Sequence, residues 1–281
     1  MKIGVQPDVR QSPKEAFEFI ADSGFDHIEI LMDHPFYSLE SLNYNELIEL
    51  IWSYDVELLI HAPATSMNFL SISKSWRKAS YEEMRKVIYL ADKCCAEVTT
   101  FHLGWNPVII NNGNFYFNYE IFDRHNEKIL KEELKPFLKQ CPVLLALENT
   151  ISFKGGIERS LDDIISETNL ALTLDVGHYN IQKCDFFIEN FKRVVNIHLH
   201  DNDGKRDEHL ALGRGNVDLS IFPLESFDHY FTIETREINS IIETRDYLIH
   251  YLNDFHDRER TRVRRTSDRF DDISKSSRFN S

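Results

Sequence analysis

Residues 198–215 concentrate side chains that could bind a metal ion. They read His-Leu-His-Asp-Asn-Asp-Gly-Lys-Arg-Asp-Glu-His-Leu-Ala-Leu-Gly-Arg-Gly and hold three histidines and three aspartates within about a dozen positions. Imidazole and carboxylate groups together are typical ligands of divalent transition metals. A solvated loop would use Lys, Glu, Ser and Asn as readily as His, so this composition indicates metal chemistry.

Similar side chains recur directly after other apolar segments of the chain. The first ionisable residues after six such segments are His61, His102, Glu148, Asp175, His198 and Glu234. Any one of them alone would more often be an ordinary hydrogen-bonding residue. Several carboxylates brought together, however, would repel one another and be forced to protonate unless a cation lay between them. We therefore expect a divalent metal if the fold gathers these residues.

The apolar segments alternate with segments of helical periodicity. The expected strands are 3–6, 27–31, 56–60, 98–101, 143–147, 170–174, 194–197 and 230–233. The expected helices are one that starts at residue 13 and ends at Gly24, and then 42–54, 76–95, 119–140, 161–168, 186–191, 219–225 and 238–252. Eight strands that each precede a helix predict an α/β fold of the (β/α)8, or TIM, barrel type. The alternative, a doubly wound open sheet, would need a Gly-rich phosphate turn, and no G-x-G-x-x-G is present.

The barrel prediction also places the candidate ligands. Active sites of such barrels lie at the carboxyl ends of the strands, so the six residues that follow the apolar segments should ring one mouth. His178 lies three residues after Asp175, and Asp207 and His209 lie in the loop after the seventh strand. All three are expected at the same mouth.

Composition limits the remaining possibilities. The barrel is expected to be a single domain, residues 1–253, and the charged residues 254–281 a flexible tail. The formal charge of −14 disfavours broad electrostatic binding to nucleic acid. No apolar run approaches the roughly 20 residues of a membrane span, so we expect a cytoplasmic protein without a membrane partner. The four cysteines lack C-x-x-C spacing and are expected to be reduced thiols in the packing.

The motifs at the strand ends resemble those of the xylose isomerase-like TIM-barrel superfamily over residues 1–253. This superfamily contains sugar and sugar-phosphate isomerases and epimerases, and the endonuclease IV type of AP endonuclease (AP endonuclease family 2). The motifs are His61-Ala62-Pro63, His102-Leu103-Gly104, Leu147-Glu148-Asn149-Thr150, Leu174-Asp175-Val176-Gly177-His178, the stretch 198–215 with Asp207-x-His209-x-x-Leu212-Gly213-x-Gly215, and Ile233-Glu234-Thr235.

The resemblance to isomerases and epimerases implies one divalent metal (Zn, Mn, Co or Mg) and a small sugar or sugar phosphate as substrate. The implied metal ligands are Glu148, Asp175, His198 and Glu234. Glu148 and Glu234 would also be the catalytic pair, which moves a proton on the substrate through an enediolate. His178 would contact the substrate, and Arg206 or Lys205 could bind its hydroxyl or phosphate.

The resemblance to AP endonucleases implies up to three zinc ions and DNA as substrate. The matching ligands are His61, His102, Glu148, Asp175, His178, His198, Asp207, His209 and Glu234. The aromatic residues that could stack on a base or a sugar ring are Trp76, Trp105, Phe115, Tyr116 and Phe117. Zinc would activate water to attack the phosphodiester at an abasic site.

Three departures from the nuclease pattern favour sugar chemistry. Glu208, between Asp207 and His209, is acidic where the nuclease pattern has a basic residue. The fourth strand ends in His-Leu-Gly in place of His-Pro-Gly, and Val176-Gly177 replaces a Thr-Cys pair.

A non-catalytic metal-binding barrel is the third hypothesis, and the intact pair Glu148 and Glu234 disfavours it. The sequence leaves the oligomeric state open.

Overall fold

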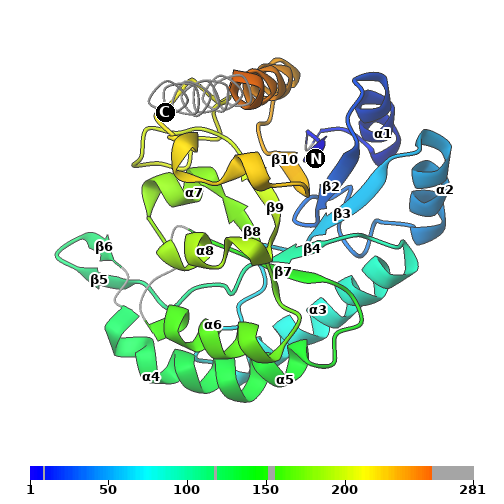
Figure 1. Ribbon diagram of the computed structural model, residues 1–281. Helices are drawn as coiled ribbons and strands as arrows, with labels where there is room; N and C mark the ends of the chain where they lie inside the picture. The colour runs from blue at the N-terminus through cyan, green and yellow to red at the C-terminus, as the bar shows by residue number, and fades with distance from the viewer. Residues whose placement is uncertain (9, 117–118, 151–155, 255–281) are drawn as a thin grey trace, which may run out of the picture.

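The computed structural model of the protein describes residues 1–8, 10–116, 119–150 and 156–254. Eight strands close into a barrel in the order β1, β10, β9, β8, β7, β4, β3 and β2, and the pairings between them are parallel (Figure 1). The predicted TIM barrel is thereby confirmed.

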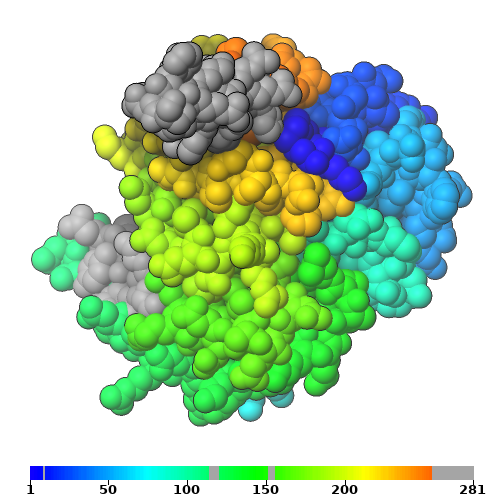
Figure 2. Space-filling view, in the orientation of Figure 1, coloured from blue at the N-terminus to red at the C-terminus, as the bar shows by residue number. Residues whose placement is uncertain are grey.

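The barrel strands agree with the predicted segments to within about two residues at each end. They are β1 (Lys2–Val5), β2 (His27–Leu31), β3 (Glu57–His61), β4 (Thr99–Phe101), β7 (Leu145–Glu148), β8 (Ala171–Asp175), β9 (Val194–Leu199) and β10 (Tyr230–Ile233). The barrel closes between β1 and β10, where Val5 pairs with Ile233. Figure 2 accordingly shows the blue N-terminal residues beside the gold segment near the C-terminal end.

Helices surround the barrel, and local signals in the sequence explain where the first one begins and ends. They are α1 (Pro13–Asp22), α2 (Tyr44–Tyr54), α3 (Lys74–Lys93), α4 (Tyr119–Ile129), α5 (Lys135–Leu138), α6 (Gly156–Glu167), α7 (Val176–Ile181), α8 (Asp185–Glu189) and a last helix over 238–254. Helix α1 starts with a capping box between Ser12 and Glu15, with Pro13 in its first turn. Gly24, at φ +70°, follows its end. Among the described residues, no helix is both long and apolar enough to span a membrane.

Several predicted boundaries are wrong. The segment predicted as one helix over 119–140 contains a π-helical turn (Leu130–Leu134) between α4 and α5. This turn ends two residues before Pro136, which has no N–H to donate. Helix α6 begins at Gly156 and not at 161, and two short 3-10 turns replace the helix predicted over 219–225. Helix α7 was not predicted. The last helix includes residue 254, and the rest of the predicted tail lies outside the described residues.

An antiparallel hairpin after β4 was also not predicted. Its strands are β5 (Ile109–Asn111) and β6 (Asn114–Tyr116), and it projects from the barrel in Figure 1. Asn112 and Gly113 both have positive φ, at 50° and 76°, as the tightest hairpin turns require.

Polar side chains occupy part of the barrel interior. His27 and Thr232 lie 2.9 Å apart, and the Thr232 hydroxyl donates to Asn196 at 2.9 Å. The Asn196 amide donates to Glu29 at 2.9 Å, and Glu29 lies 3.0 Å from Nε2 of His198. All five residues are fully buried. This hydrogen-bonded column runs along the barrel interior to the base of the mouth.

Candidate metal centre

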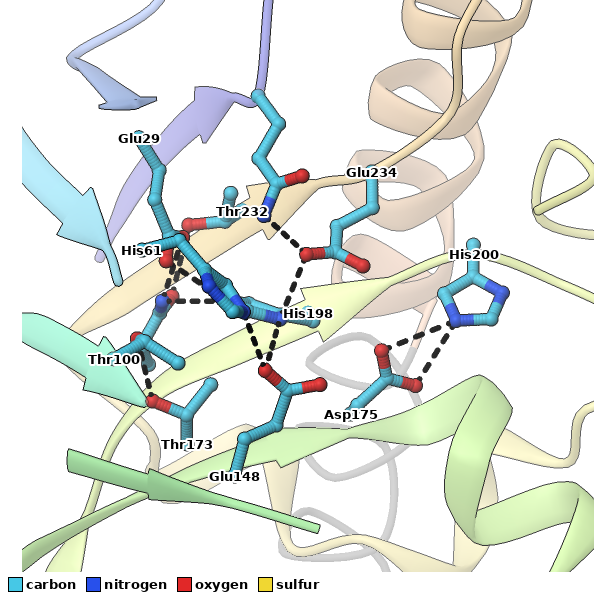
Figure 3. A network of polar contacts seen from close by, with 12 residues as sticks. Glu29, His61, Thr100, Glu148, Thr173, Asp175, His198, His200, Thr232 and Glu234 are labelled. Carbon is cyan, nitrogen blue, oxygen red and sulfur yellow. Dashed lines mark hydrogen bonds and ion pairs between the residues drawn. The ribbon is translucent and has the colours of Figure 1, made fainter. Parts of the chain in front are cut away.

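The strand-end residues predicted as ligands lie together at one mouth of the barrel (Figure 3). His61, Glu148 and Asp175 are the last residues of β3, β7 and β8. His102 and Glu234 follow β4 and β10 by one residue, and His198 is the penultimate residue of β9. Parallel strands in a closed barrel place these positions at the same level, which explains why residues so distant in sequence meet.

Glu148 lies at the centre of the cluster. Its Oε2 is 2.9 Å from Nε2 of His61, 3.0 Å from Nε2 of His102 and 3.5 Å from Nδ1 of His198. Its Oε1 is 3.1 Å from Nδ1 of His178. One buried carboxylate therefore faces four imidazole rings.

Glu234 faces the same space from β10. Its Oε1 is 2.9 Å from Nδ1 of His198 and accepts a hydrogen bond from the Gln6 amide. Ligand atoms about 2.1 Å from a tetrahedral ion lie about 3.4 Å from one another, which is the range of these separations. The ligand atoms of His61, His198 and Glu234 all lie within 4.8 Å of one another.

Asp175 joins the cluster from the end of β8. Its Oδ1 accepts the backbone N–H of His178 at 2.7 Å and so caps the N-terminus of α7. The side chain of Asn149 bonds to both the backbone N–H and the backbone carbonyl of Asp175 at 2.8 Å. Asp175 is fully buried and its position is fixed from several sides.

A second, outer cluster forms around Asp207. Its Oδ2 lies 3.3 Å from Nε2 of His178 and 3.3 Å from Nε2 of His209. His209 has φ +50°, a left-handed conformation that few non-glycine residues adopt, and this backbone places its ring over the mouth. All nine residues of the predicted ligand set are thus brought together in two adjoining clusters.

The family assignment follows from comparison with known proteins. A family model described as "Xylose isomerase-like TIM barrel" matches residues 17–251. The chain belongs to the xylose isomerase-like TIM-barrel family. The resemblance predicted from the strand-end motifs is therefore confirmed.

Individual known proteins resemble the chain to different degrees. An uncharacterized protein of Methanocaldococcus jannaschii is 31% identical over 90% of this chain and 89% of that protein. A crystal structure of a D-tagatose 3-epimerase-like protein has a TM-score of 0.74 and 28% identity, and covers 92% of this chain and 99% of its own. Endonuclease IV from Thermus thermophilus has a TM-score of 0.61 and 17% identity, and covers 90% and 100%; this similarity shows the fold alone.

The tautomers of three histidines in this xylose isomerase-like barrel fit a metal. Nδ1 of His61 lies 2.8 Å from the Ala62 carbonyl, and Nδ1 of His178 lies 2.8 Å from the Asn149 carbonyl. Nδ1 of His209 lies 3.0 Å from the Glu234 carbonyl. A carbonyl only accepts, so each Nδ1 carries the proton and each Nε2 directs a lone pair at a carboxylate. A lone pair that faces a carboxylate is repelled by it, so each of these contacts requires either a metal ion between the two groups or a second proton on the ring.

His198 presents the same arrangement with its nitrogens reversed. Its Nε2–H donates to Glu29 at 3.0 Å, so the Nδ1 lone pair faces Glu148 and Glu234. Among the described residues, this buried Nδ1 has close contacts with both carboxylates, at 2.9 and 3.5 Å, but none with hydrogen-bond geometry. Carboxylates and imidazoles of this kind suit zinc, manganese or cobalt.

Without a metal, protonated histidines balance the charge of the buried carboxylates. Burial raises the pKa of Glu148, but the charges of His102 and His198 outweigh burial and keep this pKa well below its usual range. Burial lowers the pKa of His61, but the hydrogen bond and charge of Glu148 raise it to about 9. The pKa of His198 is likewise raised well above its usual value, against burial, by Glu234, Glu29 and Glu148.

We expect metal affinity to rise with pH. The pKa of His61 is about 9, so a metal must displace its second proton at neutral pH. The apparent affinity for Zn²⁺ should increase about tenfold per pH unit, from about pH 6 to pH 8, for each proton displaced. Competition with a chelator at several pH values measures this slope. The variant His229→Gln, changed at an exposed histidine, should keep the slope, and an affinity independent of pH would contradict the expectation.

Sequence reasoning missed two buried residues next to the ligands. Glu29, in β2, bonds to His198, and the charged residue inside the apolar segment His-Ile-Glu-Ile-Leu was an available signal. His200, directly after β9, contacts Asp175. The His-Leu-His motif was noticed, but only His198 in it was given a role. Both are fully buried.

Other residues of the 198–215 stretch have local structural roles. Asp201 accepts the backbone N–H groups of Asn202, Gly213 and Val217, each at 2.9 Å, and so holds the loop in shape. Arg206 is exposed, and its backbone N–H donates to Asp203 at 3.2 Å. A contact of Arg206 with substrate stays a prediction.

Proposed function

We propose that the chain is a divalent-metal-dependent isomerase or epimerase of a small sugar or sugar phosphate. The observation that carries the proposal is the pair of buried carboxylates, Glu148 and Glu234, that face the same nitrogen of His198 at 3.5 and 2.9 Å. Both carboxylates would therefore adjoin the metal and a substrate bound to it. The similarity to a D-tagatose 3-epimerase-like protein supports the same class of reaction.

The proposed reaction uses the metal to polarise the substrate and the two glutamates to transfer protons. When bound, the metal would supply a Lewis acid that polarises the carbonyl and hydroxyl oxygens of the sugar. Glu148 and Glu234 both have pKa values below the usual range, against burial, because of neighbouring histidines, so both are carboxylates that can accept a proton. One would remove a proton from a substrate carbon. The enediolate would then receive a proton from the other glutamate, after that carboxylate had taken a proton from solvent, and deuterium from D₂O would enter the substrate in this step.

Glu234 is the better candidate for the first proton acceptor. Its Oε1 is held by Gln6 and His198, whereas its Oε2 lies 3.9 Å from His209. Glu148 is surrounded more closely, with histidine nitrogens within 3.1 Å of each of its oxygens. A proton on Glu234 would therefore disturb fewer existing contacts. His178, on α7, would contact the substrate.

The outer cluster supports a second candidate, a zinc-dependent AP endonuclease. The Oδ2 atom of Asp207 lies 3.3 Å from Nε2 of His178 and 3.3 Å from Nε2 of His209, and a further zinc site could use these three side chains. Trp76 and Trp105 are exposed and could stack on a base; Phe115 and Tyr116 lie in β6, and Phe117 lies outside the described residues. The charge of −14 weighs against this candidate.

One experiment separates the two activities. The metal-loaded protein is incubated in D₂O with a panel of ketoses and ketose phosphates, and in parallel with a duplex that contains an abasic site. The proposed function predicts that a sugar gains a deuterium, that the duplex stays intact, and that Glu234→Gln abolishes the exchange. Glu243→Gln, on a side chain that is 42% exposed, is the matched control and should exchange normally.

The metal count completes this test. About three zinc ions per chain together with nicking of the duplex would replace the proposed function by the nuclease. Deuterium exchange that persists in Glu234→Gln would remove Glu234 from the catalytic pair. Absence of both activities in the metal-loaded protein would leave the non-catalytic barrel.

A further inference from the structure

His200 is a buried histidine at the mouth that the predicted ligand set does not include. Figure 3 shows its contacts with both carboxylate oxygens of Asp175. Its Nε2 lies 3.0 Å from Oδ1 and 3.1 Å from Oδ2 of Asp175, and 3.6 Å from Oδ1 of Asp207. The ring is fully buried. These distances allow two roles: a further metal ligand, or a donor that positions Asp175.

The packing of His200 on His209 limits the ligand role. The two rings are stacked, with centroids 4.1 Å apart and planes 18° from parallel. The lone pair of an imidazole nitrogen lies in the plane of its ring. Two nearly parallel, stacked rings cannot direct these lone pairs at one ion about 2.1 Å from each. His200 therefore does not share an ion with His209. Asp175, His178 and His200 form another group that could hold an ion, and the His200→Gln variant below separates that role from donation of the Nε2–H to Asp175.

Gly177 makes room for the His200 ring. A Cβ at position 177 would lie 2.0 Å from Cε1 of His200 and 2.5 Å from both ring nitrogens. Gly177 lies in helix α7, whose backbone any residue except proline can adopt, so the space matters here rather than backbone freedom. At this position the chain departs from the Thr-Cys pair of the nuclease pattern. A cysteine side chain there could not coexist with His200 in its observed place.

We propose that His200 is a positioning residue that couples the two clusters, and that Gly177 is present to accommodate it. The imidazole fixes the Asp175 carboxylate by donation from Nε2 and supports the His209 ring by stacking. A metal ligand whose partner is removed typically loses about 10- to 100-fold in metal affinity. The inference depends on the metal site of the proposed function, but not on the reaction carried out there.

The test is a mutant cycle read out as Zn²⁺ affinity and metal content. His200→Ala and Gly177→Ala should each weaken Zn²⁺ binding by about 10- to 100-fold, since one removes the ring and the other displaces it. His200→Gln keeps an N–H at similar reach and should recover most of the loss. In the double variant, Gly177→Ala should cost nothing beyond His200→Ala, because its Cβ then meets no ring.

Controls assign each outcome. His229→Ala, at a side chain 52% exposed, should bind Zn²⁺ as the original chain does. Unchanged affinity in His200→Ala, or an equal cost of Gly177→Ala with and without His200, overturns the inference; a His200→Gln variant as weak as His200→Ala overturns the donor role. If the unaltered chain binds no Zn²⁺, the inference and the proposed metal site both fail. Zn²⁺ binding without deuterium exchange removes only the proposed reaction.

Discussion

Glu148→Gln is expected to reduce deuterium exchange into the substrate by about 10³-fold or more. Glutamine has nearly the same shape but no charge, and Glu148 is the carboxylate around which four imidazoles gather within 3.5 Å. The substitution removes a proton-transfer group and a counter-charge to these rings at once. The same variant should also bind less metal, because a neutral amide is a weaker ligand than a carboxylate.

The exchange rate and the metal content of Glu148→Gln are measured on one sample. Glu167→Gln is the matched control: this side chain is 50% exposed and pairs with Lys135 and Lys139 on the outside of the barrel. It should leave both quantities unchanged. Exchange in Glu148→Gln within about tenfold of the unaltered protein would show that Glu148 is not part of the proton transfer.

Glu29→Ala is expected to lower the free energy of unfolding by about 3–5 kcal/mol. Glu29 is fully buried, and its carboxylate accepts from His198 at 3.0 Å and from Asn196 at 2.9 Å. Its removal leaves an imidazole N–H and an amide N–H buried without their acceptor, together with a cavity. Urea denaturation of the metal-free protein measures the change.

Two further variants interpret the Glu29 result. Glu29→Gln retains an acceptor oxygen and should cost less than the alanine variant. Glu57→Ala breaks a partly exposed ion pair with Lys2 near the opposite end of the barrel, and should cost about 1 kcal/mol or less. If Glu29→Ala and Glu57→Ala had equal effects, the buried column would not contribute as described.

The barrel could be predicted well because the same pattern, an apolar strand followed by a helix, recurs along the chain. Strands buried on both faces read as apolar runs, and a closed parallel barrel brings the ends of those runs to one mouth. Positions as far apart as His61 and Glu234 could therefore be placed together without knowledge of any contact. The same logic gathered the nine candidate ligands, although their binding of a metal is still a proposal.

Features that depend on contacts between distant side chains could not be predicted from the periodicity of the sequence. The role of His200 depends on its stacking with His209 and on the space left by Gly177, and neither follows from periodicity. Helix α7 is too short to show a helical period, so only its Asp175 cap could have indicated it. The hairpin was a missed signal, because Asn112-Gly113 is a strong turn dipeptide; its strands were too short to attract notice.

The cap of α7 has a consequence for how position 175 can change over evolution. The Asp175 carboxylate closes the helix N-terminus through Oδ1 and at the same time faces the candidate metal ligands. Asparagine would preserve the cap but lose the charge, whereas glutamate would keep the charge but is a poor capping residue. Aspartate and glutamate often replace one another as metal ligands, but a glutamate at position 175 would not cap α7. Sequence drift at position 175 is thus restricted by two unrelated requirements, local folding and ligand chemistry.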